Sequence, residues 1–213
     1  MTALLIVGAG GHGKVVAETA IATGQFQTIG WLDDAPSQST VLGFPVLGAI
    51  AKFQDTDLQQ RYPQAIVAIG NPKLRLQWLR QLQVQGYKIP TLVHPQSVVS
   101  PSATLGLGSV VFAQAAINAE AHLGMGCIVN TGATVDHDCQ LGAGVHCCPG
   151  SHLAGEVQVG ERSWIGIGAA VIQQISIGSD VTIGAGAAVI RNLPDGVTAV
   201  GVPARVLSPV SPC

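Results

Sequence analysis

The chain has little charge, few aromatic side chains and no long uninterrupted apolar run. Of its 213 residues, 10% are charged and 4% are aromatic, and the formal net charge is −2. A nucleic-acid-binding surface needs a stripe of basic residues, so this composition excludes that class. No apolar run reaches the ~18 residues of a membrane span, and the N-terminus lacks a basic segment and a cleavage site. We therefore expect a cytoplasmic protein that contacts neither nucleic acid nor a membrane.

The five cysteines form no recognisable disulfide or zinc pattern. An odd number without a Cys-x-x-Cys pair fits a reducing compartment and gives no reason to expect a metal. We expect Cys127, Cys139 and Cys147 to act as small apolar core residues, because they fall on inward positions of the repeat described next. The tail from Ser208 to Cys213, which contains two prolines, is expected to be disordered.

An aliphatic residue recurs at every sixth position from Val99 to Val189, and only Cys147 in this series is not Leu, Ile or Val. The period matches neither a helix nor a simple strand. It is typical of a parallel β-helix, in which each hexapeptide forms one face of a three-sided coil. A glycine often follows the aliphatic residue, where we expect a corner with unusual φ and ψ angles. The glycines concerned are Gly106, Gly124, Gly142, Gly160, Gly166, Gly178 and Gly184.

Before the repeat, apolar strands alternate with helical stretches, which predicts a small parallel α/β sheet of the Rossmann-like half-domain type. The expected strands cover residues 3–7, 28–32, 65–70 and 89–93, and the expected helices cover residues 14–23, 48–61 and 73–85. The expected domains are therefore this module (1–94), the β-helix (95–195) and a C-terminal segment (196–213).

Gly8, Gly10 and Gly13 match G-x-G-x-x-G, and the acidic pair at 33–34 follows about 20 residues later, as in the dinucleotide fingerprint. Taken alone, this motif predicts NAD binding. We discount that interpretation because the module has room for only one mononucleotide-binding half. Glycine amides at a helix N-terminus still suit a diphosphate, such as that of a nucleotide sugar. His12 adds a hydrogen-bonding group at the same turn.

The most informative polar stretch of the repeat contains His137 and Asp138. Because Val135 and Cys139 point inward, His137 stands near a corner and faces solvent or a neighbouring subunit. A histidine whose second nitrogen is held by a carboxylate is a better oriented and more basic general base. His146 follows half a coil later. The pair predicts proton-transfer chemistry at this corner.

Several short motifs along the chain match one family. They are GAGGHG at 8–13, LDD at 32–34, AIGN at 68–71, NT at 130–131, HD at 137–138 and GVPAR at 201–205. Together they resemble the NeuD/PglD-like sugar O- and N-acetyltransferases, hexapeptide-repeat acyltransferases with a left-handed parallel β-helix. The resemblance extends over about residues 3–207.

This resemblance implies an enzyme that moves an acetyl group from acetyl-CoA to the amine, or the hydroxyl, of a sugar. The expected acceptor is a nucleotide-linked 4-amino-4,6-dideoxy sugar, and a sialic-acid-type sugar acetylated on oxygen is the alternative. It also implies a homotrimer whose active sites lie between subunits, with acetyl-CoA as co-substrate and no metal. The sequence leaves open which sugar and which nucleotide are bound.

The family's functional residues carry over position by position. His137 is then the general base and Asp138 holds its imidazole, although the family pattern has glutamate at the position of Asp138. The nucleotide sugar is expected at Gly10, Gly11, His12, Asp33, Asp34 and Gly70. Acetyl-CoA is expected at His146, Gly155, Ile167 and Ala185, with the Gly155 amide as candidate oxyanion donor and residues 202–205 near the nucleotide end.

Two other classes share parts of this pattern. A metal-dependent enzyme of the γ-carbonic-anhydrase kind would use histidines of adjacent prisms as zinc ligands. His122, His137, His146 and His152 raise that possibility, but their spacing does not reproduce the ligand pattern. A non-catalytic sugar-nucleotide-binding protein is the other alternative, and the intact His137-Asp138 pair argues against it.

Overall fold

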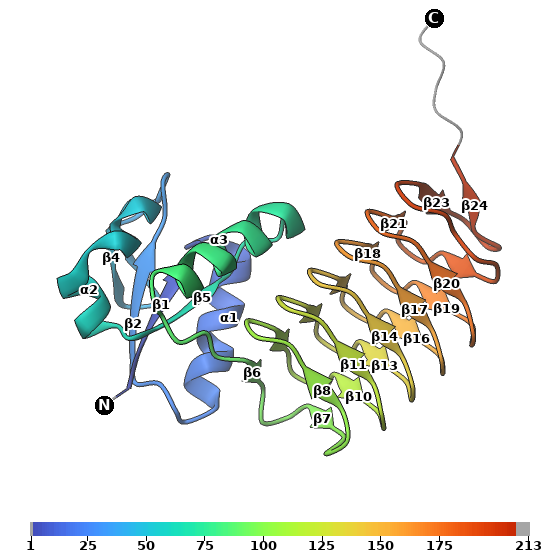
Figure 1. The fold of residues 1–213 in the computed structure, drawn as a ribbon, viewed down its shortest axis with the longest axis horizontal. Coiled ribbons are helices and arrows are strands. Elements are labelled where there is room, and N and C mark those ends of the chain that lie inside the picture. Colours follow the sequence, from blue (N-terminus) through green and yellow to red (C-terminus); the bar gives the residue numbers. More distant parts are fainter. Residues whose placement is uncertain (1, 208–213) are drawn as a thin grey trace, which may run out of the picture.

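The structure is a computed structural model that describes residues 2–207, and it consists of an α/β module followed by a three-sided prism of short strands (Figure 1). The module lies at one end of the prism, and the last strands lie at the other. No helix within residues 2–207 is long and apolar enough to cross a membrane. The disorder expected for residues 208–213 lies outside the described residues.

The sheet of the module has the strand order β3-β4-β2-β1-β5, with β3 antiparallel and the others parallel. The strands are β1 (Ala3–Val7), β2 (Thr28–Leu32), β3 (Thr40–Val41), β4 (Phe44–Gly48) and β5 (Gln64–Val67). The helices are α1 (Gly11–Ala22), the 3-10 helix η1 (Ile50–Gln54), α2 (Thr56–Arg61) and α3 (Pro72–Val84).

The strand β1 is buried on both faces of the sheet. Leu4 and Ile6 pack with α1 and with side chains of the prism, whereas Leu5 and Val7 pack with α3 on the opposite face. Coverage of both faces explains why β1 has a continuous apolar sequence rather than an alternating one. The half-domain prediction is therefore confirmed.

Two details of the module differ from the sequence prediction. The helix expected over residues 48–61 is interrupted at Asp55, whose carboxylate accepts hydrogen bonds from two N–H groups and caps α2. The β3–β4 hairpin was not expected. Leu42 and Gly43 form its two-residue turn with φ angles of 50° and 77°, the backbone that such turns require.

The prism is the parallel β-helix that the six-residue period predicts, of the left-handed kind that the family resemblance implies, with one sheet on each of three faces. Face 1 contains β6 (Leu92–Val93), β9 (Val110–Val111), β12 (Ile128–Val129), β15 (His146–Cys147), β18 (Trp164–Ile165), β21 (Thr182–Ile183), β23 (Thr198–Val200) and β24 (Arg205–Val206). Face 2 contains β7 (Val98–Val99), β10 (Ala116–Ile117), β13 (Thr134–Val135), β16 (His152–Leu153), β19 (Ala170–Val171) and β22 (Ala188–Val189). Face 3 contains β8 (Thr104–Leu105), β11 (His122–Leu123), β14 (Gln140–Leu141), β17 (Gln158–Val159) and β20 (Ser176–Ile177).

The chain passes from face 1 to face 2 at the first corner, from face 2 to face 3 at the second, and back to face 1 at the third. Equivalent residues of successive coils pair directly, as Val135 does with Leu153, so aliphatic columns fill the interior. Cys127, Cys139 and Cys147 are fully buried in that core, as predicted.

The predicted reason for the corner glycines is wrong. Gly124 and Gly142 do not have positive φ angles; the left-handed backbone lies two positions later, at Gly126 and Gly144. A Cβ at Gly124 would instead come within 2.7 Å of the backbone nitrogen of Ala143 in the next coil. The glycines that follow the aliphatic positions are therefore required by the close approach of stacked coils.

Strand pairing extends across the expected domain boundaries. On face 1, β6 pairs with β9 and so begins the prism before residue 94, and β23 pairs with β21 beyond residue 195. That residues 1–94, 95–195 and 196–213 form separate domains stays a prediction.

Candidate active site

The glycines of the first βα turn have two different roles. Gly8 has a φ of +106°, and a Cβ there would lie 2.8 Å from the carbonyl oxygen of Ala68. Gly13 packs against the carbonyl of Gly8 in the same way. At Gly10 and Gly11, in contrast, a Cβ would have no atom within 4 Å, and α1 begins there without a side-chain cap. This leaves an open helix N-terminus that suits an anion.

The two aspartates after β2 hold neighbouring loops. Asp33 accepts the N–H of Ala9 at 2.8 Å and the N–H of Ala35 at 2.9 Å, and Asp34 accepts the N–H of Ile50 at 2.8 Å. Gly70, after β5, has open space on its Cα. The predicted nucleotide-sugar residues therefore lie together at the carboxyl ends of β1, β2 and β5.

His12 extends from the first turn of α1 onto the prism. Its ring centroid lies 5.7 Å from that of Phe112 and 6.3 Å from that of His146, which itself packs against Trp164 at 4.2 Å. A predicted sugar-binding residue and a predicted acetyl-CoA-binding residue are thus neighbours. Sequence reasoning had placed them in separate sites.

Both of these histidines are neutral at physiological pH. Burial, with the charge of Arg75 adding to it, lowers the pKa of His12 to about 4. Burial, followed by the charges of Arg75 and His12, lowers the pKa of His146 to about 3. His12 Nε2 and His146 Nδ1 are buried and have no hydrogen-bond partner within residues 2–207, while His146 Nε2 lies 3.2 Å from Asn130 Nδ2.

A hollow of about 400 Å³ runs along the first corner next to His146. Three of the four predicted acetyl-CoA residues line it, and they are His146, Ile167 and Ala185. The Ile167 side chain is 60% exposed there, which leaves an apolar surface at the edge of the hollow. The fourth predicted residue, Gly155, lies at the second corner.

His137 and Asp138 form a hydrogen bond at the second corner, where Nδ1 of the imidazole lies 2.7 Å from Oδ2 of the carboxylate. Asp138 has a φ of 59°, and its side chain reaches the preceding ring although it is shorter than glutamate. The hydrogen bond to Asp138 raises the pKa of His137 above its usual value. The imidazole lies over Gly155, where a Cβ would be 2.5 Å from Cε1 and Nε2.

A further contact at this corner was missed by sequence reasoning. Asp136 Oδ1 accepts the backbone N–H of His137 at 2.8 Å and an amide N–H of Asn118 at 2.7 Å. The Asn118 bond lowers the pKa of Asp136, so this carboxylate stays ionised. The separation of eighteen residues between Asn118 and Asp136, one full coil, was the available signal.

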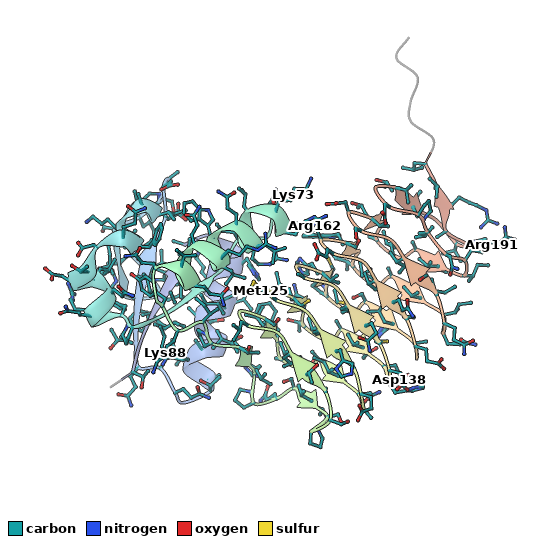
Figure 2. The ribbon with its side chains drawn as sticks, in the orientation of Figure 1. Lys73, Lys88, Met125, Asp138, Arg162 and Arg191 are labelled. Carbon is teal, nitrogen blue, oxygen red and sulfur yellow. The ribbon has the colours of Figure 1, made fainter. Side chains whose placement is uncertain are left out.

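Within one chain, His137 does not lie next to the hollow or to the open helix N-terminus that adjoins it. His137 lies at the second corner and the hollow lies at the first, so the width of face 2 separates them. Figure 2 shows Asp138 on the side of the prism opposite Lys73, which is in the first turn of α3, and Arg162, which lies next to that helix. The outward side chains of face 2 between these corners are mostly small, and they are Val98, Ala116, Thr134, His152, Ala170 and Ala188.

The histidines considered as metal ligands lie on different surfaces of the prism. His122, on face 3, is 2.6 Å from Thr104 Oγ1, and His152, on face 2, is 2.9 Å from Thr134 Oγ1. In the part of the chain that the structure describes, no three metal-ligating side chains gather.

Comparison with known proteins identifies relatives of this arrangement. The PglD N-terminal domain matches residues 3–82. The acetyltransferase domain of PglB from Neisseria gonorrhoeae is 47% identical, with 97% of this chain and 100% of that chain covered and a TM-score of 0.93; it is also known in complex with acetyl coenzyme A. PerB from Caulobacter crescentus, in complex with CoA and GDP-perosamine, is 44% identical, with 98% of each chain covered and a TM-score of 0.91.

A curated relative matches over part of its length. The UDP-N-acetylbacillosamine N-acetyltransferase of Bacillus subtilis (strain 168) is 41% identical over 115 residues, which are 53% of this chain and 52% of that enzyme. The match thus spans about half of either protein. Taken with the full-length structural matches, the Rossmann-like module and the β-helix, these findings show that the chain belongs to the NeuD/PglD-like family of sugar acetyltransferases.

Proposed function

We propose that this protein transfers the acetyl group of acetyl-CoA to the amino group of a nucleotide-linked 4-amino-4,6-dideoxy sugar. The observation that carries the proposal is the contact between His12 and His146, which joins the open helix N-terminus to the hollow at the first corner. A relative of this chain contains CoA and GDP-perosamine together. The two regions therefore suit two substrates that bind side by side.

The sugar nucleotide would bind at the carboxyl end of the small sheet. The first N–H groups of α1 have no side-chain cap, and Gly10 and Gly11 leave space for a diphosphate to approach the backbone. Gly70 leaves similar space after β5. Asp33 and Asp34 would act by holding the loops around this pocket, since their oxygens accept backbone N–H groups.

Acetyl-CoA would lie in the hollow of the first corner. His146 lines this hollow, and Ile167 provides an apolar surface for the pantetheine chain. Residues 202–205 would lie near the nucleotide end of the cofactor, as the family resemblance implies.

His137 would take a proton from the sugar amine as its nitrogen attacks the thioester carbonyl carbon. A C–N bond forms, the C–S bond breaks, and CoA leaves as the thiol after its sulfur receives the proton that His137 took up. Asp138 would hold the imidazole in the tautomer whose Nε2 accepts this proton. The Gly155 N–H, which no other residue within 2–207 engages, would stabilise the oxyanion.

A second copy of the chain would complete the site. If face 2 of each subunit turns toward a threefold axis, the second corner of one prism comes next to the first corner of its neighbour. This arrangement brings His137 of one subunit to the hollow of another, and it covers the exposed apolar side chains of Val98 (69%) and Ile167 (60%). Sedimentation of the purified protein tests for the homotrimer.

The experiment that tests the function follows free thiol release from acetyl-CoA with UDP-, GDP- and TDP-linked amino sugars. We expect His137→Ala to lower kcat by about 10²–10⁴-fold, the usual contribution of a general base. His122→Ala is the matched control, because the side chain of that histidine lies on face 3 against Thr104 and lines neither the hollow nor the open helix N-terminus. Turnover of a hydroxyl sugar in place of the amine would favour the O-acetyltransferase, and substrate binding without thiol release would favour the non-catalytic alternative.

A further inference from the structure

Arg75 is a buried guanidinium that bonds only to backbone carbonyls. It lies in the first part of α3 and is 1% exposed. Nε donates to Gly126 O at 2.8 Å and Nη2 donates to Gly144 O at 2.8 Å, both on the prism. Nη1 donates to the carbonyls of Ile69 and Gly70 at 2.9 and 2.7 Å, both in the loop after β5. Within residues 2–207, no carboxylate pairs with it.

The two prism carbonyls belong to neighbouring coils of the third corner. Gly126 and Gly144 have φ angles of +65° and +74°, and a Cβ on either would press on Leu76 of α3, at 3.3 and 3.0 Å. The absence of a side chain at these two glycines lets α3 approach the prism closely enough for Arg75 to reach it. Sequence reasoning did not single out this residue.

The other two carbonyls belong to the loop that carries Gly70, one of the predicted sugar-nucleotide residues. Arg75 therefore joins a ligand-binding loop of the module to the rigid body that carries the acetyl-CoA hollow. A single planar group holds all four carbonyls, a geometry that the one ammonium group of lysine cannot reproduce.

We propose that Arg75 is a positioning residue, which fixes the Ile69–Gly70 loop against the prism and so holds this loop in the conformation that binds the nucleotide sugar. This inference rests on the proposed function. The residue acts through the loop rather than by touching the reacting atoms. Its fixed charge also disfavours protonation of His12 and His146, which form the adjoining contact between the two regions.

Arg75→Lys separates positioning from general stability, because lysine keeps the positive charge but lacks the planar guanidinium that donates to all four carbonyls. We expect the KM for the nucleotide sugar to rise about tenfold or more, whereas the KM for acetyl-CoA and the kcat at saturation change by less than about threefold. We expect only the KM for the nucleotide sugar to change, because Arg75 contacts the prism at the third corner and the acetyl-CoA hollow lies at the first. Arg80→Lys, at an exposed position of the same helix, is the matched control and should leave all three constants unchanged.

Amide hydrogen exchange gives a readout that does not depend on turnover. The amides of residues 74 and 75 donate to Oδ1 and O of Asn71, at the end of this loop. In Arg75→Lys, and in Arg75→Gln, these two amides should exchange faster than in the wild type while the buried strands of the prism keep their protection. Equal increases in both KM values, or no increase in either, would overturn the proposal, as would unchanged exchange at 74 and 75. If the wild-type protein turns over no nucleotide sugar, the proposed function fails, and the exchange measurement still decides whether Arg75 anchors the loop.

Discussion

A methyl group on Gly155 would lie 2.5 Å from Cε1 and Nε2 of the His137 ring. Ordinary contacts of a Cβ begin at 3.4 Å, so in Gly155→Ala the imidazole has to retreat by about 0.9 Å. The ring can do so, because the His137 side chain is 54% exposed. A misplacement of about 1 Å can lower a rate by about 10²-fold, and we expect a fall in kcat of that order.

Stability should move in the opposite direction in the same variant. Gly155 does not have a positive φ, so alanine fits its backbone. Replacing glycine by alanine at a compatible position raises the free energy of unfolding by about 0.4–1 kcal/mol, because the unfolded chain loses conformational freedom. A less active enzyme that is no less stable is therefore the expected result.

The assay is thiol release at saturating substrates, with thermal denaturation as the stability measurement. Gln173→Ala, at the equivalent position of the same corner one coil later, is the matched control. In the double variant His137→Ala/Gly155→Ala, the second substitution should add almost nothing to the loss from the first, since both act on one imidazole. Unchanged kcat in Gly155→Ala, or losses that simply multiply, would refute the reasoning.

Two further predictions concern pH. Asp138→Asn replaces the charged acceptor that raises the pKa of His137 with a neutral amide. The acid limb of the kcat/KM profile should therefore move to lower pH, and a limb that stays in place contradicts the pairing. His12 and His146 have pKa values near 4 and 3 when folded and about 6.5 when unfolded, so the unfolded chain takes up protons first as pH falls below 6.5. The free energy of unfolding should therefore fall between pH 6.5 and 4 by up to about 2.7 kcal/mol per unit, and His146→Gln should remove about half of that slope in urea titrations. An unchanged slope in the variant would show that His146 is not held neutral by burial.

The fold was predictable because its signal is local and repeated. Each hexapeptide places an aliphatic residue inside the prism, so the six-residue period fixes which positions point inward. Cys139 and Cys147 were assigned to the core on that basis. The β3–β4 hairpin was missed because its turn, Leu42-Gly43, has only one glycine. The corner glycines were assigned the wrong reason, because contacts between coils are invisible in a single hexapeptide.

The candidate site was predictable only where its partners are neighbours in sequence. His137 and Asp138 are adjacent, so their pairing could be inferred before the structure. Arg75 lies 51 residues from Gly126 and 69 from Gly144, and no short motif joins them. That contact depends on how the module packs on the prism, which the sequence pattern of either part does not contain.

The most direct test of the central claim is free thiol release from acetyl-CoA by the wild-type protein and by His137→Ala, with GDP- or UDP-linked 4-amino-4,6-dideoxy sugars as acceptors. We predict one equivalent of CoA thiol for each acetylated sugar in the wild type, and a kcat lower by about 10²–10⁴-fold in His137→Ala. Equal rates in the two proteins, or no amino-sugar-dependent thiol release from the wild type, would contradict the account.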